Sequence, residues 1–226
     1  MNSDVNTARA AAWPRRSAKA RATRAAIIAA ASRLFTEQGY LAPSVQLIAD
    51  TAGVSRATVF NSVGGKAALL RAAYDAATVG DDEPVPLPRR PEALAIRAEP
   101  DPARAIEMYA ALATSISSRL ARIYEAFRSA AGVDPEVGAM WEQIQAERLG
   151  GARGFVQIIS SKLAGLPRPP ADAGDLIWVL IDTSLYHRLV IERNWSNQRF
   201  QHWLADTMKA QLLPPGNRPD RQASSG

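Results

Sequence analysis

The stretch VSRATVFNSVGGK, residues 54–66, carries serine, arginine, threonine and asparagine on a segment short enough to be one helix. A helix that served only for packing would not need so many polar groups. The longer run VQLIADTAGVSRATVFNSV, residues 45–63, puts Ala49 where two helices would cross, Gly53 at a turn and Val59 inside the second helix. This spacing is typical of a helix-turn-helix, because a small residue lets helices approach and glycine accepts a positive φ.

The predicted helix-turn-helix has an inner and an outer face. Its crossing angle is expected to be fixed by Ile48, Val54, Val59 and Phe60. The free face of its second helix is expected to carry Ser55, Arg56, Ala57, Thr58, Asn61 and Ser62. Hydroxyl, guanidinium and carboxamide groups bind phosphates and base edges in the major groove of DNA. The alternative is that these residues are only helix caps and solvated positions.

The distribution of charge agrees with a DNA-binding segment. Residues 1–80 carry ten Lys or Arg and four Asp or Glu, whereas residues 81–226 carry 17 and 18. The net charge of +5 therefore comes from the first third of the chain. Such an asymmetry indicates an N-terminal module that meets a polyanion, although a solvated basic surface would give the same count.

Apolar periodicity predicts an all-α protein. We expect helices at about 20–38, 45–52, 66–78, 102–130, 135–163, 173–193 and 197–213, with a short helix capped by Ser55 and ending near Ser62. No convincing strand pattern is present, and the proline-rich segment at 80–92 reads as a linker. The expected organisation is a flexible basic arm (1–19), a helix-turn-helix domain (20–79), a helical domain (80–213) and a disordered tail (214–226).

Two segments resemble one known family. The run GVSRATVFNSVGGKAALL, within residues 21–74, resembles the DNA-binding domain of the TetR family of transcriptional regulators. The segment from Trp178 to Leu213 resembles the last two helices of many members. The resemblance implies an all-α fold with an N-terminal three-helix helix-turn-helix domain and a C-terminal helical domain for ligand binding and dimerisation. It also implies a transcriptional regulator, a repressor in our reading, rather than an enzyme.

The resemblance assigns roles to several residues near the turn. It implies a phosphate contact for the Thr58 hydroxyl, an aromatic position at Phe60 and a DNA-backbone contact for Lys66. Ser62 and Val63 stand where the family has a histidine and a phenylalanine, so we expect an altered affinity for DNA. The predicted DNA-binding residues are Ser44, Ser55, Arg56, Ala57, Thr58, Phe60, Asn61, Ser62, Lys66 and Arg24. Arginines of the N-terminal arm could also reach DNA, or could simply be solvated.

The second module is predicted to form a homodimer and to bind an effector. Proteins with this motif pair so that two recognition helices read two half-sites of a palindromic operator in double-stranded DNA. The predicted dimer interface consists of Leu180, Leu185, Leu189, Phe200, Trp203, Leu204 and Met208. The resemblance implies a small, often hydrophobic effector, for which the candidate pocket residues are Met108, Tyr109, Ile116, Trp141, Ile144, Trp178 and Tyr186. Both sets could instead be ordinary core.

Other classes of protein have little support in the sequence. The chain has no cysteine and two histidines, His187 and His202, and no metalloprotease, P-loop or serine hydrolase motif, so we expect neither a metal nor a cofactor. The absence of cysteine and of a long apolar run favours a cytoplasmic protein without a membrane partner. A ligand-independent DNA-binding protein, or a small helical enzyme, remains as an alternative.

Overall fold

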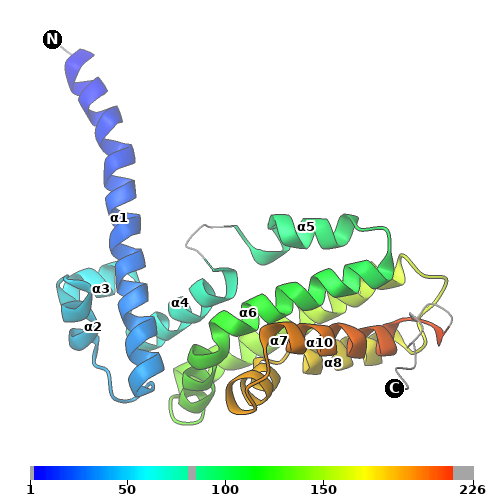
Figure 1. The fold of residues 1–226 in the computed structure, drawn as a ribbon. Helices are drawn as coiled ribbons and strands as arrows, with labels where there is room; N and C mark the ends of the chain where they lie inside the picture. Colours follow the sequence, from blue (N-terminus) through cyan, green and yellow to red (C-terminus); the bar gives the residue numbers. More distant parts are fainter. Residues whose placement is uncertain (1–2, 81–84, 216–226) are drawn as a thin grey trace. The chain divides into compact units, whose positions relative to one another are not determined.

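The computed structural model describes residues 3–80 and 85–215, with side chains from residue 18 onward (Figure 1). Within these ranges all regular structure is helical, as predicted. The helices are α1 (Ser3–Gln38), α2 (Val45–Ala52), α3 (Arg56–Ser62), α4 (Lys66–Val79), the 3-10 turn η1 (Leu87–Arg89), α5 (Pro91–Ala98), α6 (Pro102–Ala131), α7 (Pro135–Ser160), α8 (Pro170–Leu180), α9 (Thr183–Tyr186), the π-helix η2 (His187–Glu192) and α10 (Asn197–Leu212). None of the described helices is long and apolar enough to cross a membrane.

The N-terminal end of the chain differs from the prediction. α1 begins at Ser3, so most of the segment predicted as a flexible arm is helical. The segment lacks apolar periodicity, yet it is rich in alanine and arginine, which have high intrinsic helix propensity. The predicted C-terminal tail lies almost entirely outside the described residues.

The segment predicted as one helix at 173–193 is interrupted. α8 ends at Leu180, and α9 begins at Thr183 with Asp182 as its N-cap. The Asp182 carboxylate accepts a hydrogen bond of 2.9 Å from the Ser184 backbone N–H. Arg148 of α7 reaches the same break and donates to Asp182 Oδ2 at 2.9 Å and to the Trp178 carbonyl at 3.4 Å. A side chain from another helix therefore adds to the local hydrogen bonds at this interruption.

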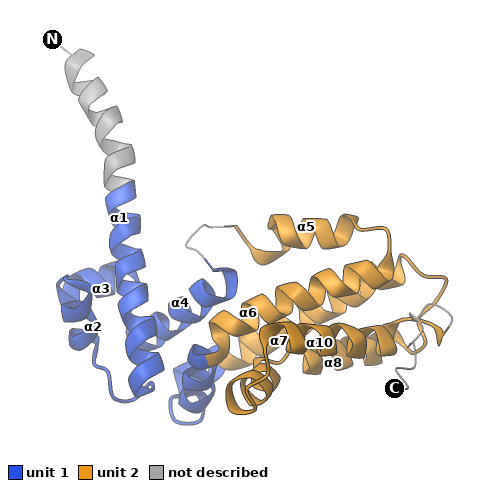
Figure 2. Ribbon diagram, in the orientation of Figure 1, with its two compact units in different colours: residues 1–82, 122–140 blue, residues 83–121, 141–226 orange. Residues whose placement is uncertain are grey.

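The chain forms two compact units, which Figure 2 colours separately. Unit 1 contains residues 1–82 and 122–140, and unit 2 contains residues 83–121 and 141–226. The first boundary between the units lies between residues 82 and 83, within the segment at 80–92 that was predicted to be a linker. Residues 122–140, which contain the end of α6 and the start of α7, were expected in the C-terminal domain and instead belong to unit 1.

The core of unit 1 is built around α1. Ile27, Ala31 and Phe35 are fully buried on one face of this helix, at the spacing that predicted it. α1 packs against α2, α3 and α4. Phe127 of α6 is also fully buried and meets the Tyr74 ring edge-on, with ring centroids 5.5 Å apart. The end of α6 therefore contributes an aromatic anchor to the same unit as the helix-turn-helix.

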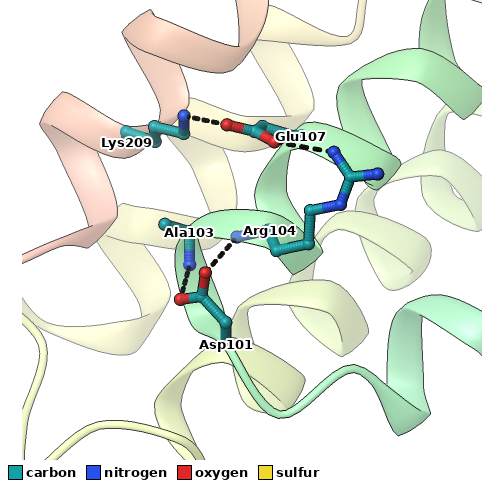
Figure 3. A network of polar contacts seen from close by, with 5 residues as sticks. All are labelled: Asp101, Ala103, Arg104, Glu107 and Lys209. Atoms are coloured by element: carbon teal, nitrogen blue, oxygen red, sulfur yellow. Dashed lines mark hydrogen bonds and ion pairs between the residues drawn. The ribbon is translucent and has the colours of Figure 1, made fainter. Parts of the chain in front are cut away.

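The core of unit 2 is apolar and rich in aromatic side chains. Its fully or almost fully buried members include Ile106, Phe155, Ile159, Ile177, Phe200 and Met208. Beside this core, α6 and α10 are linked by a polar network (Figure 3). Glu107 accepts from Lys209 Nζ at 2.6 Å and from Arg104 Nη1 at 3.0 Å, and Asp101 caps the start of α6. The hydrogen bond from Lys209 is the largest influence that lowers the pKa of Glu107.

Candidate nucleic-acid interface

The turn between α2 and α3 has the geometry that the sequence predicts. Gly53 ends α2 in the left-handed conformation, with φ 69°, and its N–H bonds to the carbonyls at the end of α2. Ser44 caps α2 through a 3.0 Å bond from the Leu47 N–H, and Ser55 caps α3 through a 3.1 Å bond from the Thr58 N–H. These caps satisfy backbone donors that a short helix otherwise leaves unpaired, so both helices are held at their first turn.

The packing of the helix-turn-helix confirms three predicted inner positions and corrects one. Ile48, Ala49 and Val59 are completely buried. Phe60 was expected to help fix the crossing angle, and this expectation is wrong, because its ring is 45% exposed. In a helix of seven residues, Val59 already fills the inward position and its neighbour Phe60 is rotated about 100° away from it.

The outer face of α3 is open to solvent. Arg56, Ala57, Phe60 and Asn61 are exposed, while Thr58 and Ser62 are half-buried. The Arg56 guanidinium lies over the Phe60 ring, with Cζ 5.4 Å from the ring centroid. The Thr58 and Ser55 hydroxyls are 2.8 Å apart and share a hydrogen bond. The structure therefore brings a guanidinium, an aromatic ring, a carboxamide and hydroxyls onto one short helix.

The connection from α3 to α4 depends on glycine at one position. Gly64 has a φ of 123°, which L-residues rarely adopt, and a Cβ at this position would lie 3.0 Å from the Ala68 Cβ. The Gly64 N–H also bonds to the Val59 carbonyl at 3.2 Å, which closes the end of α3. Lys66, the first residue of α4, follows directly from this turn.

Lys66 lies in a small polar cluster rather than free in solvent. Its Nζ donates to the Leu41 carbonyl at 2.8 Å and lies 4.8 Å from the centroid of the Tyr40 ring. The Tyr40 hydroxyl donates to Asp134 Oδ2 at 2.7 Å. Burial lowers the pKa of Lys66. Burial and the neighbouring Asp134 raise the pKa of Tyr40, and the hydrogen bond from Tyr40 lowers the pKa of Asp134. Lys66 must exchange an intramolecular acceptor for a phosphate if it contacts DNA.

Arg24 has an intramolecular role in this structure. Its Nη1 donates to the carbonyl of Ser62, the last residue of α3. A cation at the C-terminal end of a helix bonds to its unpaired carbonyls and interacts favourably with its dipole. Arg24 therefore attaches α1 to the recognition helix. Lys19 and Arg21 are exposed on α1, whereas the side chains of Arg15 and Arg16 lie outside the described residues.

The residues predicted for an effector pocket are only partly brought together. Tyr186 is buried in the core of unit 2, and Met108, Tyr109 and Trp178 pack against it; Ile116, Trp141 and Ile144 are not part of this cluster. Tyr109 stacks on Phe155 with centroids 3.7 Å apart, and burial raises its pKa. The Tyr186 hydroxyl bonds to Asn197 Oδ1 at 2.6 Å. The buried Nε1 of Trp178 has no hydrogen-bond partner among the described residues.

A groove of about 470 Å³ lies between α6 and α10 in unit 2. It is lined by Arg104, Glu107, Met108, Ala111, Gln201, His202, Ala205, Asp206 and Lys209. Only Met108 was predicted for a ligand site, so this polar groove is distinct from the aromatic cluster. In the described part of the chain, no group of three acidic or histidine side chains is placed to hold a metal ion.

The residues predicted for the dimer interface divide into two groups. Phe200, Leu204 and Met208 are buried in the core of unit 2, so the prediction that they meet a second copy is wrong. These residues of α10 belong to the core of their own protomer, and α10 packs against α8 and η2. Leu180, Leu185, Leu189 and Trp203 are only partly buried. Val179 and Ile191, which were not predicted, are 50% and 46% exposed.

Sequence reasoning missed three residues that organise the two units. These are Tyr40, Asp134 and Arg148. Asp134 precedes Pro135 at the start of α7, a position typical of a helix cap, but its bond to a tyrosine 94 residues away left no local signal. Arg148 lies in a polar stretch of α7 and resembles an ordinary surface residue, although its side chain is only 14% exposed.

The class of protein follows from α3. A short helix with a buried back and a polar front, fixed to its neighbour by a tight turn, is the recognition element of helix-turn-helix DNA-binding proteins. Residues 27–73 match the sequence model described as "Bacterial regulatory proteins, tetR family". This match covers the segment that forms the helix-turn-helix and agrees with the resemblance to the TetR family of transcriptional regulators, and with the expectation of a regulator rather than an enzyme.

Solved structures share the fold over most of the chain. NalD, the secondary repressor of the MexAB-OprM multidrug efflux pump in Pseudomonas aeruginosa, is 21% identical with a TM-score of 0.63, over 85% of this chain and 96% of NalD. SmeT, solved in complex with triclosan, is 17% identical with a TM-score of 0.61, over 91% of this chain and 98% of SmeT. At these identities the likeness is one of fold. No curated protein matches the sequence.

Proposed function

We propose that this DNA-binding regulator is a repressor that binds a palindromic operator as a homodimer and is released by a small hydrophobic effector. The observation that carries the proposal is the outer face of α3, where Arg56, Ala57 and Asn61 are exposed while Val59 behind them is fully buried. The seven-residue helix is too short to read more than a few base pairs. Pairing of two copies, with recognition helices about 34–36 Å apart, would supply the missing specificity.

The dimer surface that we propose lies on α8, α9, η2 and the exposed side of α10. Val179 of α8 and Ile191 of η2 are about half exposed, and Leu180, Leu185, Leu189 and Trp203 are partly exposed beside them. Large apolar side chains on a free surface favour association, since burial of each contributes roughly 1.5–3 kcal/mol when complete. Phe200, Leu204 and Met208 support this surface from within the protomer.

The effector site that we propose is the aromatic cluster of unit 2. Tyr109, Trp178 and Tyr186 offer flat apolar surfaces together with hydroxyl and indole donors, which suits a small aromatic or hydrophobic molecule. The similarity of fold to SmeT, which was solved with triclosan, supports an effector of this kind. Release from DNA would follow if the effector bound more tightly to a conformation that does not fit the operator.

A titration of the protein into labelled DNA from upstream of its own coding region tests the proposal. We expect saturable binding that survives excess unrelated DNA and weakens with salt by about 0.9 log units per neutralised phosphate. Lys66→Ala and Thr58→Ala should weaken binding. Lys162→Ala is a matched control, because Lys162 also donates from Nζ to a backbone carbonyl, at 2.9 Å, but belongs to unit 2. Equal binding to all DNA sequences would contradict an operator-specific regulator.

The alternative of a ligand-independent DNA-binding protein makes a different prediction. A regulator with an effector should show at least one compound that raises the melting temperature and releases the operator, with Tyr109→Ala losing both responses. A ligand-independent protein should bind the operator equally well in the presence of every compound. The similarity of residues 27–73 to a family of regulators argues against the small-enzyme alternative.

A further inference from the structure

We infer that Phe60 and Arg56 together read a thymine and a neighbouring guanine in each half-site of the operator. Phe60 contacts the C5 methyl group of the thymine, and Arg56 donates to the guanine of the adjacent base pair. This inference rests on the proposed binding of α3 in the major groove and names the bases that the helix would select.

The position of Phe60 is the first observation. The ring is 45% exposed on the outer face of α3, so a large part of this apolar side chain meets solvent in the free protein. One edge of the ring faces Gly65, where an added Cβ would lie 3.9 Å from the Phe60 Cε1 atom. Because glycine stands at 65, no side chain from that position covers the ring. The aromatic surface is therefore available to a partner.

The chemistry of the ring limits what that partner can be. A phenyl group has no hydrogen-bond donor or acceptor, so it reads a base only through an apolar contact. In the major groove the apolar group that distinguishes one base from another is the C5 methyl of thymine. Phe60 therefore favours thymine over cytosine at the position that it faces.

The position of Arg56 is the second observation. The guanidinium carbon lies 5.4 Å from the centroid of the Phe60 ring, in a cation–π contact between residues one helical turn apart. No carboxylate is described within ion-pair distance of Arg56 in the part of the chain that the structure covers, so its donors are available. Arginine makes its most frequent specific contact with the O6 and N7 atoms of guanine.

The separation of the two groups sets the separation of the two bases. Base pairs are stacked about 3.4 Å apart along the helix axis, so groups held roughly 5 Å apart meet neighbouring base pairs rather than a single pair. The contact between the guanidinium and the ring also restricts the long Arg56 side chain before DNA binds, which reduces the entropy lost in the complex. The pair therefore acts as one preformed reading element.

The test begins with selection of bound sequences from random double-stranded DNA by the full-length protein. Each thymine of the selected half-site is then replaced in turn by deoxyuridine, which differs only by the loss of the C5 methyl group. We expect one thymine per half-site at which the replacement weakens binding about fourfold, the value for one buried methyl-sized group. Phe60→Ala should bind the thymine and deoxyuridine sites equally, and Phe60→Leu should keep part of the difference.

The guanine contact is tested with 7-deazaguanine, which lacks the N7 acceptor. At the base pair next to the critical thymine we expect about a tenfold loss for the wild-type protein and no further loss for Arg56→Ala. Both substituted positions are exposed, so the variants should fold, and circular dichroism checks this.

The outcomes separate this inference from the proposed function. If no sequence is enriched from the random pool, operator-specific binding fails and the inference fails with it. Two other results are contrary: a palindrome is enriched while no thymine responds to deoxyuridine, or Phe60→Ala keeps the full difference in affinity between thymine and deoxyuridine sites. Either result would overturn the inference that Phe60 and Arg56 read these bases, while the repressor proposal stands.

Discussion

Two interruptions between helices, one in each unit, are built from different kinds of contact. Between α2 and α3 the chain turns at Gly53, and each helix is capped by a serine that precedes it by one residue. Between α8 and α9 the chain turns at Ile181 and Asp182, and Arg148 from α7 donates hydrogen bonds on both sides of the break. The first interruption is encoded within about a dozen residues, whereas the second combines the local cap at Asp182 with a contact from Arg148, 34 positions away.

This difference suits the two units to different tasks. A turn held by local hydrogen bonds keeps α3 in a fixed orientation to α2, which a recognition helix needs in order to place side chains against bases. A break held by a long-range ion pair depends on the packing of α7 against α8 and α9. Its geometry can respond to anything that moves those helices, such as an effector beside Trp178.

Arg148→Met should be the most destabilising of the changes that we predict. The variant keeps the apolar stem but loses the 2.9 Å ion pair with Asp182. The side chains of Arg148 and Asp182 are 14% and 21% exposed. Removal of one member of a buried pair costs about 3–5 kcal/mol, and partial exposure reduces the expected loss to about 2–3 kcal/mol. Urea unfolding followed by circular dichroism measures the change. Arg153→Met is the matched control, since its pair with Asp175 is more than half exposed and should contribute under about 1 kcal/mol. Equal losses for the two variants would contradict the structural role of Arg148.

Gly53→Ala tests the local turn and should have a smaller effect. The φ of 69° at Gly53 places an L-residue in the left-handed region, at a cost of about 1–2 kcal/mol. Steric clash adds nothing, because no atom lies within 4 Å of the position of the new Cβ. Gly150→Ala provides a control of opposite sign. Gly150 lies inside α7 with equally open surroundings, so alanine should stabilise the protein by about 0.5–1 kcal/mol. Thermal unfolding measures the change in stability of both variants. If both changed stability in the same direction, the left-handed conformation of Gly53 would not explain its effect.

Ser55→Ala should cost about 1 kcal/mol and should also affect DNA binding. Its Oγ caps α3 and bonds to the Thr58 hydroxyl. Alanine removes the cap, which lowers stability, and it also removes the hydrogen bond that orients the Thr58 hydroxyl, which is predicted to contact a DNA phosphate. Ser196→Ala removes the equivalent cap of α10, where Oγ accepts from the Arg199 N–H at 3.1 Å. Both variants should lose similar stability in thermal unfolding, but only Ser55→Ala should bind operator DNA more weakly. A similar loss of DNA affinity in Ser196→Ala would show that Ser55 acts through stability alone.

The contrast between the two interruptions also explains what the sequence could predict. Gly53, Ser44 and Ser55 act on neighbours three or four residues away, so their spacing was enough to predict α2, α3 and the turn. Phe60 was assigned both to the crossing of the two helices and to the DNA-binding residues, and the sequence did not show that Val59 already fills the inward position. The break at Asp182 and the contact of Tyr40 with Asp134 depend on residues distant in sequence, for which helical periodicity carries no information.

The weakest expected effect concerns the ion pair between α6 and α10. The Lys209 hydrogen bond is the main reason that the pKa of Glu107 lies below its ordinary value of 4.5. A carboxyl group whose pKa is lowered by folding stabilises the protein above its unfolded pKa, and this contribution disappears as the pH falls through the folded pKa. Glu107→Gln keeps an acceptor for Lys209, and the Glu107 side chain is 40% exposed. At neutral pH the variant should therefore lose under about 1 kcal/mol of folding stability.

The pH dependence distinguishes this ion pair from simple packing. The difference in stability between wild type and Glu107→Gln should be constant from pH 7 to about pH 5, should decline as the pH falls below 4.5, and should vanish once the pH is below the lowered pKa of Glu107 in the folded protein. Lys209→Met should reduce the same acid-dependent contribution, and the double variant should lose less than the sum of the two single changes, because both remove one interaction. Melting temperatures between pH 3 and pH 7 measure this. A difference that persisted unchanged at pH 3 would mean that Glu107 stabilises the contact through its shape, and that α10 is held to α6 by packing alone.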